Sequence, residues 1–411
     1  MSELSYLEKL LDGVEVEWKA VGDIAGYSTT KVDADKLDAT SFVGVDNLLA
    51  DKGGRIDATY QPNTARLTAY EPGDILLGNI RPYLKKVWMA ENNGGCSGDV
   101  LAIRILADCK KIISPEYLYY ALSSDSFFSY SMQHAKGAKM PRGSKDAILN
   151  YQIPIPCPSA PEKSLAIQSE IVRILDKFTA LTAELTAELN MRKKQYNYYR
   201  NQLLSFDEGE VEWKALGEIG EVRMCKRILK SQTSSEGEIP FYKIGTFGKE
   251  PDSYISRRLF NEFKEKYSYP KVGEVLISAS GTIGRTVIFD GRESYFQDSN
   301  IVWIENNERI VLNKYLFYFY KIAKWGISEG GTIKRLYNDN LRKLMIPVPF
   351  PDSPERSLVE QQKIVKLLDK FDALTNSITE GLPREIELRQ KQYEYYRDLL
   401  FSFPKPDTVS N

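Results

Sequence analysis

Apolar residues recur at helical spacing in two long segments of the chain. In the first, Pro161 to Phe206, they fall mostly three or four positions apart, and residues 351–403 repeat this spacing. The pattern predicts two long amphipathic helices, each with an apolar seam of the coiled-coil type. The seam positions that we expect at helix crossings or partner interfaces are Phe178, Leu181, Leu185, Tyr196, Tyr199, Phe371, Leu374, Tyr393 and Tyr396.

Shorter patterns precede each long helix. GDILLGN (73–79) and GEVLISA (273–279) are typical of strands, whereas PEYLYYALSSDSFF (115–128) and NKYLFYFYKIAKW (313–325) are typical of helices. Proline-rich runs, IPIPCPSAP and IPVPFPDSP, separate these regions from the long helices. The sequence therefore predicts an α+β fold in which two mixed α/β domains alternate with two long antiparallel helices.

The chain repeats itself. VEWKAVGDI at 16–24 recurs as VEWKALGEI at 211–219, and RKKQYNYYRNQLLSF at 192–206 recurs as RQKQYEYYRDLLFSF at 389–403. The displacement grows by four residues near Gly381 and Pro383, where we expect a kink. LEKLLDGVEVEWK at the start also resembles the join between the copies. These repeats predict an internal duplication with a pseudo-twofold axis and neighbouring termini.

Composition narrows the class of protein. At 411 residues and 42% apolar content, the chain should form more than one domain. It shows neither an apolar run long enough for a membrane helix nor a signal peptide, so we expect a soluble cytoplasmic protein without a membrane partner. The four cysteines stand singly, and His134 is the only histidine, so we expect no metal site.

A net charge of −1 argues at first against a nucleic-acid partner. Locally the balance differs, because residues 221–350 hold 21 lysines and arginines against 15 acids. Basic and amide side chains beside glycines occur in loops at matching places of the two copies, as a DNA-reading surface requires. The alternative is an ordinary solvated loop. The candidate DNA-binding residues are Asn79, Arg81, Lys136, Lys139, Arg142, Lys145, Ser280, Thr282, Arg285, Thr332, Lys334 and Arg335.

Catalytic signatures are absent from the sequence. No phosphate-binding loop or dinucleotide fingerprint occurs, and one histidine limits acid–base chemistry. Asp252, Glu262 and Lys264 imitate the spacing of a metal-dependent nuclease, although such short motifs arise easily by chance. A chain without catalytic residues is expected. A nuclease and a protein-interaction scaffold without DNA preference remain the alternatives.

Taken together, the repeated VEWKA frames, the IP-P motifs before long helices and the closing QY-YYR segments resemble the specificity subunit of type I restriction-modification enzymes. The resemblance covers essentially the whole chain, and TAELTAEL (182–189) resembles the spacer repeat of one branch. It implies target-recognition domains at 1–156, with a short N-terminal helix, and at 207–350, helical spacers at 157–206 and 351–403, and a tail at 404–411.

The same resemblance implies a function. Each domain would read one half of a split, asymmetric site in double-stranded DNA, while the helices set the gap and bind two methylation subunits. Motor-nuclease restriction subunits would join afterwards, and S-adenosylmethionine, ATP and magnesium would belong to these partners. One TAEL unit lengthens a helix by ~6 Å. A coiled coil that merely joins the domains is the simpler alternative, and base stacking on the tyrosines is a further one.

Overall fold

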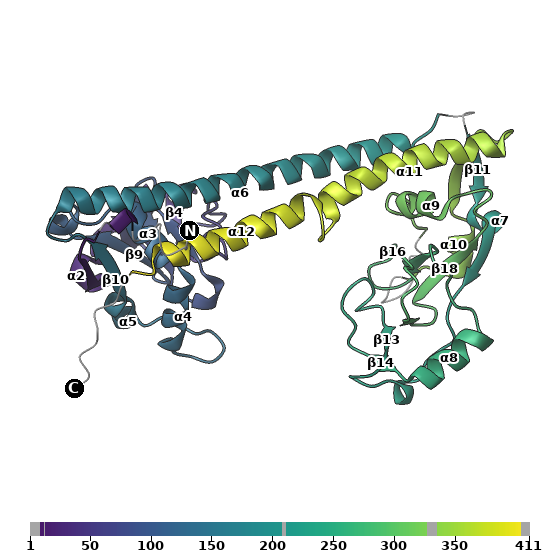
Figure 1. The fold of residues 1–411 in the computed structure, drawn as a ribbon, viewed down its shortest axis with the longest axis horizontal. Coiled ribbons are helices and arrows are strands. Elements are labelled where there is room, and N and C mark those ends of the chain that lie inside the picture. The colour runs from purple at the N-terminus through teal and green to yellow at the C-terminus, as the bar shows by residue number, and fades with distance from the viewer. Residues whose placement is uncertain (1–8, 12, 208–210, 327–334, 404–411) are drawn as a thin grey trace. The chain divides into compact units, whose positions relative to one another are not determined.

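The computed structural model describes residues 9–11, 13–207, 211–326 and 335–403 (Figure 1). The chain divides into two compact units. Unit 1 comprises Met1–Leu185 and Ile386–Asn411, and unit 2 comprises Thr186–Glu385. Each unit contains one mixed domain together with parts of the long helices, so the predicted alternation of two folded domains with two helical segments is confirmed.

Two four-stranded sheets form the centre of the unit 1 domain. One is wholly antiparallel, in the order β2 (Ala25–Tyr27), β9 (Val100–Ile105), β6 (Ile75–Gly78) and β7 (Val87–Met89). The other contains one parallel pair, β4–β8, in the order β3 (Lys31–Asp33), β5 (Arg66–Tyr70), β8 (Gly94–Cys96) and β4 (Phe42–Val43). The predicted strand GDILLGN is β6.

Short helices cover the antiparallel sheet. Three of them begin at serines, Ser114, Ser124 and Ser144, whose hydroxyls accept a hydrogen bond from the backbone N–H three residues later. Such caps satisfy N–H groups that the first helical turn leaves without a partner. The helices of this domain are α2 (Val21–Ile24), α3 (Pro115–Leu122), α4 (Asp125–Gln133), α5 (Lys145–Asn150), and the 3₁₀ turns η1 (Ala34–Lys36), η2 (Pro82–Leu84) and η3 (Ala107–Cys109).

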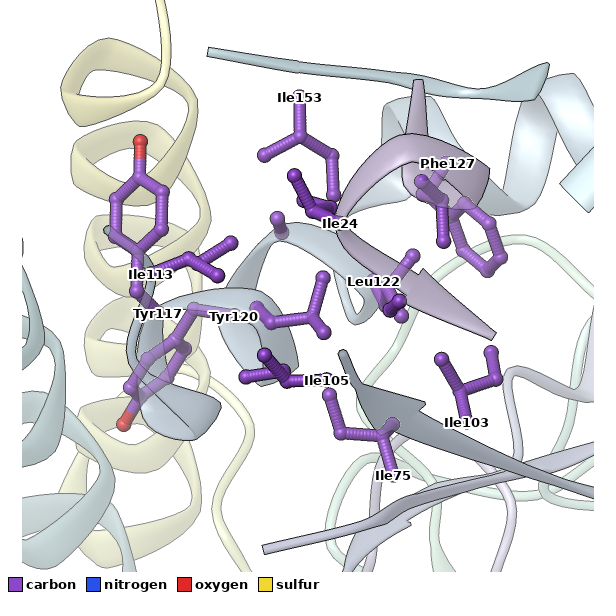
Figure 2. Close-up of a cluster of buried hydrophobic side chains, with 14 of the residues drawn as sticks. Ile24, Ile75, Ile103, Ile105, Ile113, Tyr117, Tyr120, Leu122, Phe127 and Ile153 are labelled. Carbon is purple, nitrogen blue, oxygen red and sulfur yellow. The ribbon is translucent and has the colours of Figure 1, made fainter. Parts of the chain in front are cut away.

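The main core of unit 1 lies between that sheet and its helices. Side chains from α2, β6, β9, α3, α4 and the strand β10 (Gln152–Pro156) converge there, as Figure 2 shows. Ile24, Ile103, Tyr117 and Phe127 are completely inaccessible to solvent. Leu11 lies in the same core as Leu400 and Phe403, so the two ends of the described chain meet, as the sequence predicts.

The unit 2 domain repeats this plan. Its antiparallel sheet has the order β12 (Gly220–Arg223), β18 (Ile301–Asn306), β15 (Val275–Ser278) and β16 (Thr286–Ile288). A smaller sheet contains β14 (Tyr254–Ile255), β13 (Ile239–Tyr242) and β17 (Tyr295–Phe296). The helices are α7 (Leu216–Ile219), α8 (Arg257–Lys266), α9 (Asn313–Tyr320), α10 (Asn338–Arg342) and η4 (Lys230–Gln232). In Figure 1, α9 lies between the sheet and the long helix α11 (Pro354–Asn376).

The repeated VEWKA motif forms one strand of a two-stranded ribbon in each unit. In unit 1, β1 (Val16–Ala20) pairs antiparallel with β10 (Gln152–Pro156), and in unit 2, β11 (Val211–Ala215) pairs with β19 (Met345–Pro349). The register is the same, with the first valine opposite the last proline. Because each ribbon joins the beginning of a domain to its end, VEWKA and IP-P recur together.

The first long helix is continuous, whereas the second is interrupted. α6 spans Pro161–Leu203, while α11 (Pro354–Asn376) and α12 (Gly381–Leu400) are separated by residues 377–380. Gly381 adopts φ +75°, and a Cβ there would collide with the carbonyl oxygen of Ala373. The expected kink is therefore a full break: α11 ends at Asn376, and Gly381 at the start of α12 has a left-handed backbone that a continuous right-handed helix cannot contain.

The helices pack antiparallel within each unit. In unit 1, Phe178 of α6 stacks on Tyr396 of α12 with ring centroids 5.3 Å apart. In unit 2, Tyr199 of α6 stacks on Phe371 of α11 at 5.5 Å. Over the part of the chain that the structure describes, no helix is both long and apolar enough to cross a membrane.

Candidate nucleic-acid interface

Three loops meet at one end of the unit 1 sheet. The loop after β6 contains Asn79 and Arg81, whose backbone N–H groups donate to Asp99 (2.9 Å) and Pro141 (2.7 Å). Gly143 N–H in turn donates to the carbonyl of Asn79 at 3.0 Å. These bonds bring the turn before β9 and the basic segment 134–143 beside the loop after β6, so the two basic sequence patches form one surface.

Unit 2 uses the same three connections with different residues. Ala279, which follows β15, donates to the carbonyl of Asn300 at 2.7 Å and accepts from Leu336 N–H at 2.8 Å. An isolated bridge also joins Ser280 to Arg335, as one joins Ile80 to Arg142 in unit 1. The backbone frame of the candidate interface is therefore duplicated, while the side chains that it presents differ.

The predicted residues of unit 1 divide into exposed cations and one buried amide. Arg81 is exposed with φ +52°, a left-handed conformation that a non-glycine residue rarely adopts. Asn79 is only 9% exposed, and its Oδ1 is buried without a hydrogen-bond partner in the described residues. The remaining cations are exposed, namely Lys136, Lys139, Arg142 and Lys145; Arg142 forms a 3.1 Å ion pair with Asp99, and the Lys145 ammonium lies 5.8 Å from the Tyr27 ring.

In unit 2 the predicted residues are more deeply engaged. Ser280 is 9% exposed and donates to Asn300 Oδ1 at 2.8 Å, so it orients that amide. Arg285 is half-buried and donates to the Phe247 carbonyl at 2.9 Å. Thr282 is exposed. Thr332 and Lys334 lie outside the described residues, and Arg335 is half-buried, donating to the Ser299 carbonyl at 3.0 Å.

A polar groove of about 690 Å³ lies next to Arg335. Three cations line it that the sequence patterns do not single out, Arg227, Lys230 and Lys243, together with the carboxylates of Asp252 and Asp298. Asn300 and Gln297 also line the groove, with their side-chain oxygens held by Ser280 and by Ile244 N–H. An amide oriented by its oxygen leaves its N–H donors for a ligand. Cations with fixed amides suit phosphates and base edges.

The residues that imitate a nuclease are not brought together. Asp252 forms a 2.8 Å ion pair with Lys243, and the hydrogen bond from Lys243 lowers the pKa of Asp252. Glu262 and Lys264 lie on α8, where Glu262 pairs with Lys266 at 3.1 Å. Among the described residues, no group of three acidic, histidine or cysteine side chains could hold a metal ion. Asp252, Glu262 and Lys264 instead contact different neighbours, namely Lys243, Lys266 and the Tyr269 ring.

Five of the predicted helix-seam residues contact an aromatic ring of the facing helix, namely Phe178, Tyr196, Tyr199, Phe371 and Tyr396. Tyr196 is buried, with its ring centroid 6.3 Å from that of Phe371. Tyr393 lies 5.6 Å from the Arg397 guanidinium. Exposure is greater elsewhere, with Leu181 36%, Tyr199 44% and Tyr396 41% exposed, while Leu185 and Leu374 are half-buried. Neighbouring Tyr198 and Tyr395, at 58% and 46%, enlarge the exposed aromatic surface.

Comparison with known proteins agrees with this arrangement. The family model of the type I restriction modification DNA specificity domain matches residues 72–192 and 208–388. A type I restriction enzyme specificity subunit of Haemophilus influenzae is 48% identical over 97% of this chain and 98% of its own length. The EcoR124I/EcoR124II specificity subunit of Escherichia coli is 42% identical over the full length of both chains.

Solved structures share the fold. The crystal structure of a type I restriction-modification S subunit from M. genitalium superposes with a TM-score of 0.54 at 14% identity, covering 96% of this chain and 98% of that chain. A chain from a structural study of type I complex assembly and conformational transition gives 0.57 at 18% identity, covering 94% and 97%. The protein thus belongs to the type I restriction-modification specificity family: it is the subunit, itself non-catalytic, that binds DNA target sites within that complex.

Proposed function

We propose that each unit reads one half of a split, asymmetric DNA site. The observation that carries the proposal is the duplicated loop frame, in which the residues after β6 and β15 make the same backbone hydrogen bonds. The side chains differ: the places of Asn79 and Ile80 in unit 1 are taken by Ala279 and Ser280 in unit 2. Loops with the same backbone arrangement but different side chains suit two different half-sites. Base identity is read by side chains, whereas the backbone only holds them in place.

The long helices would set the gap between the half-sites. α6 is uninterrupted through both TAEL copies, Thr182–Leu185 and Thr186–Leu189. The division between the two compact units falls between these copies. Four residues of helix correspond to ~6 Å. The chain would thus belong to the branch in which the number of spacer repeats determines the gap.

Partners would bind the helix pairs. The exposed aromatic rings at 198–199 and 395–396 occupy equivalent positions of the repeat, so two identical methylation subunits could each use one of them. Restriction subunits would join this assembly. S-adenosylmethionine would then be held by the methylation subunits, and ATP and magnesium by the restriction subunits. We place the assembly in the cytoplasm, where the DNA of a bacterium lies.

Selection from a randomised duplex library tests the proposal. The full chain is mixed with its host's methylation subunits, and the bound DNA is sequenced. We expect two short, unlike motifs at one fixed gap. Enrichment of a single motif would contradict reading by both units, and the absence of enrichment would favour a scaffold without DNA preference.

A further inference from the structure

The reading loops of unit 1 are fastened to a long helix through one carboxylate. Asp125, the first residue of α4, accepts a hydrogen bond from Lys85 Nζ at 2.6 Å and from Arg397 Nη2 at 2.9 Å. Lys52 Nζ lies 3.5 Å from the same carboxylate. Lys85 ends the loop that begins at Asn79, and Arg397 belongs to α12. Three separate chain segments therefore converge on Asp125.

Backbone geometry shows what this convergence holds in place. Asp51, Lys52, Arg81 and Lys85 all have positive φ, between 50° and 62°, which is unfavourable for residues with a Cβ. Asp51 and Lys52 N–H donate to the carbonyls of Leu84 and Lys85, each at 2.9 Å. The loop after β6 is thus in a conformation that outside contacts must maintain. The Lys85 and Lys52 contacts to Asp125 supply them.

The second reading loop starts from the same residue. α4 runs from Asp125 to Gln133, and the basic segment 134–143 comes directly after it. This segment returns to the first loop through the bond from Arg81 N–H to the Pro141 carbonyl at 2.7 Å. Asp125 therefore stands at the base of both loops that carry the exposed cations of unit 1.

The ion pair between Arg397 of α12 and Asp125 is partly buried, which strengthens it. The Arg397 side chain is completely inaccessible to solvent, whereas Asp125 and Lys85 are each one-third exposed. The Arg397 guanidinium also donates to Asp398 Oδ1 at 2.9 Å, so loss of Asp125 would leave this buried cation with one of its two carboxylates, which is costly. Hydrogen bonds from Lys85 and Arg397 outweigh the burial of Asp125 and keep its pKa well below the usual range.

The described residues of unit 2 do not repeat this arrangement. Arg200 corresponds to Arg397 in the duplicated QY-YYR segments, yet it hydrogen-bonds Asn201 at 3.5 Å and lies 5.4 Å from the Tyr196 ring. Lys321 and Asp372 form a separate 3.2 Å ion pair beside it. The contacts of Asp125 with Lys52, Lys85 and Arg397 are thus specific to unit 1 and do not belong to the duplicated part of the fold.

We infer that Asp125 is a positioning residue for recognition of the first half-site, because it fixes the loops of Arg81 and Arg142 to helix α12. The inference rests on the proposed function, since it requires that unit 1 reads its own half-site. It assigns to Asp125, Lys85 and Arg397 no contact with DNA. Their effect on base preference would pass entirely through the two loops.

The test repeats the library selection with variants of the full chain in complex with methylation subunits. Asp125→Asn keeps the shape of the side chain but removes its charge. Lys85→Gln and Lys85→Arg form a matched pair that loses or keeps the cation. We expect Asp125→Asn and Lys85→Gln to lower discrimination at the first half-site by roughly tenfold, the scale of one good side-chain contact to a base. Lys85→Arg should restore most of it.

Controls within the same experiment distinguish a loss of loop positioning from general misfolding of the variant. The second half-site and the gap should stay as in the unaltered chain, and Lys321→Gln in unit 2 should leave both half-sites unchanged. An unchanged first half-site in folded Asp125→Asn protein would overturn the inference, as would an equal loss at both half-sites. If Asp125→Asn does not fold, the Lys85 pair decides. If the unaltered chain selects no motif, the proposed function itself fails.

Discussion

Single buried side chains couple each long helix to its domain. Gln168 of α6 donates to the Ile112 carbonyl at 2.7 Å and accepts from Ser114 N–H at 3.0 Å. Gln361 of α11 makes the equivalent bonds to Ile310 and Leu312, both at 2.9 Å. Neither amide is accessible to solvent. A buried amide with both ends bonded specifies one register of helix against domain, because any slip leaves polar groups unpaired.

Replacing Gln361 by Ala should therefore lower the free energy of unfolding by about 1–3 kcal/mol, since a backbone donor and acceptor lose their partner in the core. Urea unfolding followed by circular dichroism measures this change. Gln362→Ala, one position along on the exposed side of α11, is the control and should stay within about 0.5 kcal/mol. Equal effects of both substitutions would show that the buried bonds contribute nothing special.

The charge on Asp125 predicts a pH dependence. Because its pKa is lowered in the folded state, the network contributes stability at every pH above the ordinary aspartate pKa of about 4 and loses it as the pH falls further. The chain and its Asp125→Asn variant should then differ by a constant amount between about pH 5 and pH 8, a window set around that reference value. Below it the difference should shrink. Thermal unfolding at several pH values measures this difference. A stability difference that grows as the pH falls below about 5 would show that the pKa of Asp125 is not lowered by folding.

Arg227 of the unit 2 groove should act on phosphate and not on sequence. Its removal by Arg227→Ala is expected to weaken DNA binding uniformly and to reduce the slope of log affinity against log salt by about one. Fluorescence anisotropy at several salt concentrations measures both quantities. Arg258→Ala, which removes an exposed arginine of α8 that does not line the groove, should change neither. A selective loss at one base pair would instead make Arg227 a base-reading residue.

At the scale of elements, α6 is where length matters. Deleting Thr186 to Leu189 shortens the helix by ~6 Å and rotates the remainder of α6 by about 40°, because four residues exceed one turn of 3.6. We expect the selected DNA to keep both half-sites at a different gap. The double variant Thr186→Ala, Glu188→Ala is the control. It changes the TAEL sequence but keeps the length of α6, so the gap between the half-sites should stay the same. An unchanged gap after the deletion would show that α6 only joins the two domains and does not set the spacing of the half-sites.

The elements also show where sequence reasoning succeeds and fails. The helix predicted from Pro161 to Phe206 ends at Leu203, because 3.6-residue periodicity is a local property of the chain. The break at 377–380 was expected only as a kink, since the left-handed backbone of Gly381 depends on the carbonyls packed beside it. Pairing of VEWKA with IP-P was not predicted, because strand partners are distant in sequence.

The candidate site is harder to predict for the same reason. Exposed cations such as Lys136 and Lys139 can be predicted from local composition, and they are exposed in the structure. Asn79 is a candidate DNA-binding residue from its sequence context, yet its side chain is buried and its Oδ1 lies against Gly143. Lys230 and Lys243 were missed, since only the folding of β13 and its flanking loops brings them to Arg335. Contact with DNA remains a prediction for every one of these residues.

At the scale of the whole molecule, the two compact units should behave independently. Asp125→Asn acts in unit 1 and Arg335→Lys acts in unit 2, and each residue has its hydrogen-bond partners within its own unit. Distant, unconnected changes usually add within about 0.3–0.5 kcal/mol. The double variant should therefore lose discrimination at each half-site by the amount that each single variant loses. Selection with all three proteins would expose any larger coupling.

The pairing of the first and last strands of each domain has a consequence for genetic recombination. Ala20 lies opposite Gln152, and Ala215 lies opposite Met345, so each reader leaves its ribbon and returns to it at adjacent points. A genetic crossover within the codons of the two ribbon strands would exchange a complete recognition surface as a cassette. The interfaces with other subunits would be inherited unaltered. Such an exchange would change the DNA site that the subunit binds in one recombination event, while the paired strands at which the segment begins and ends are kept.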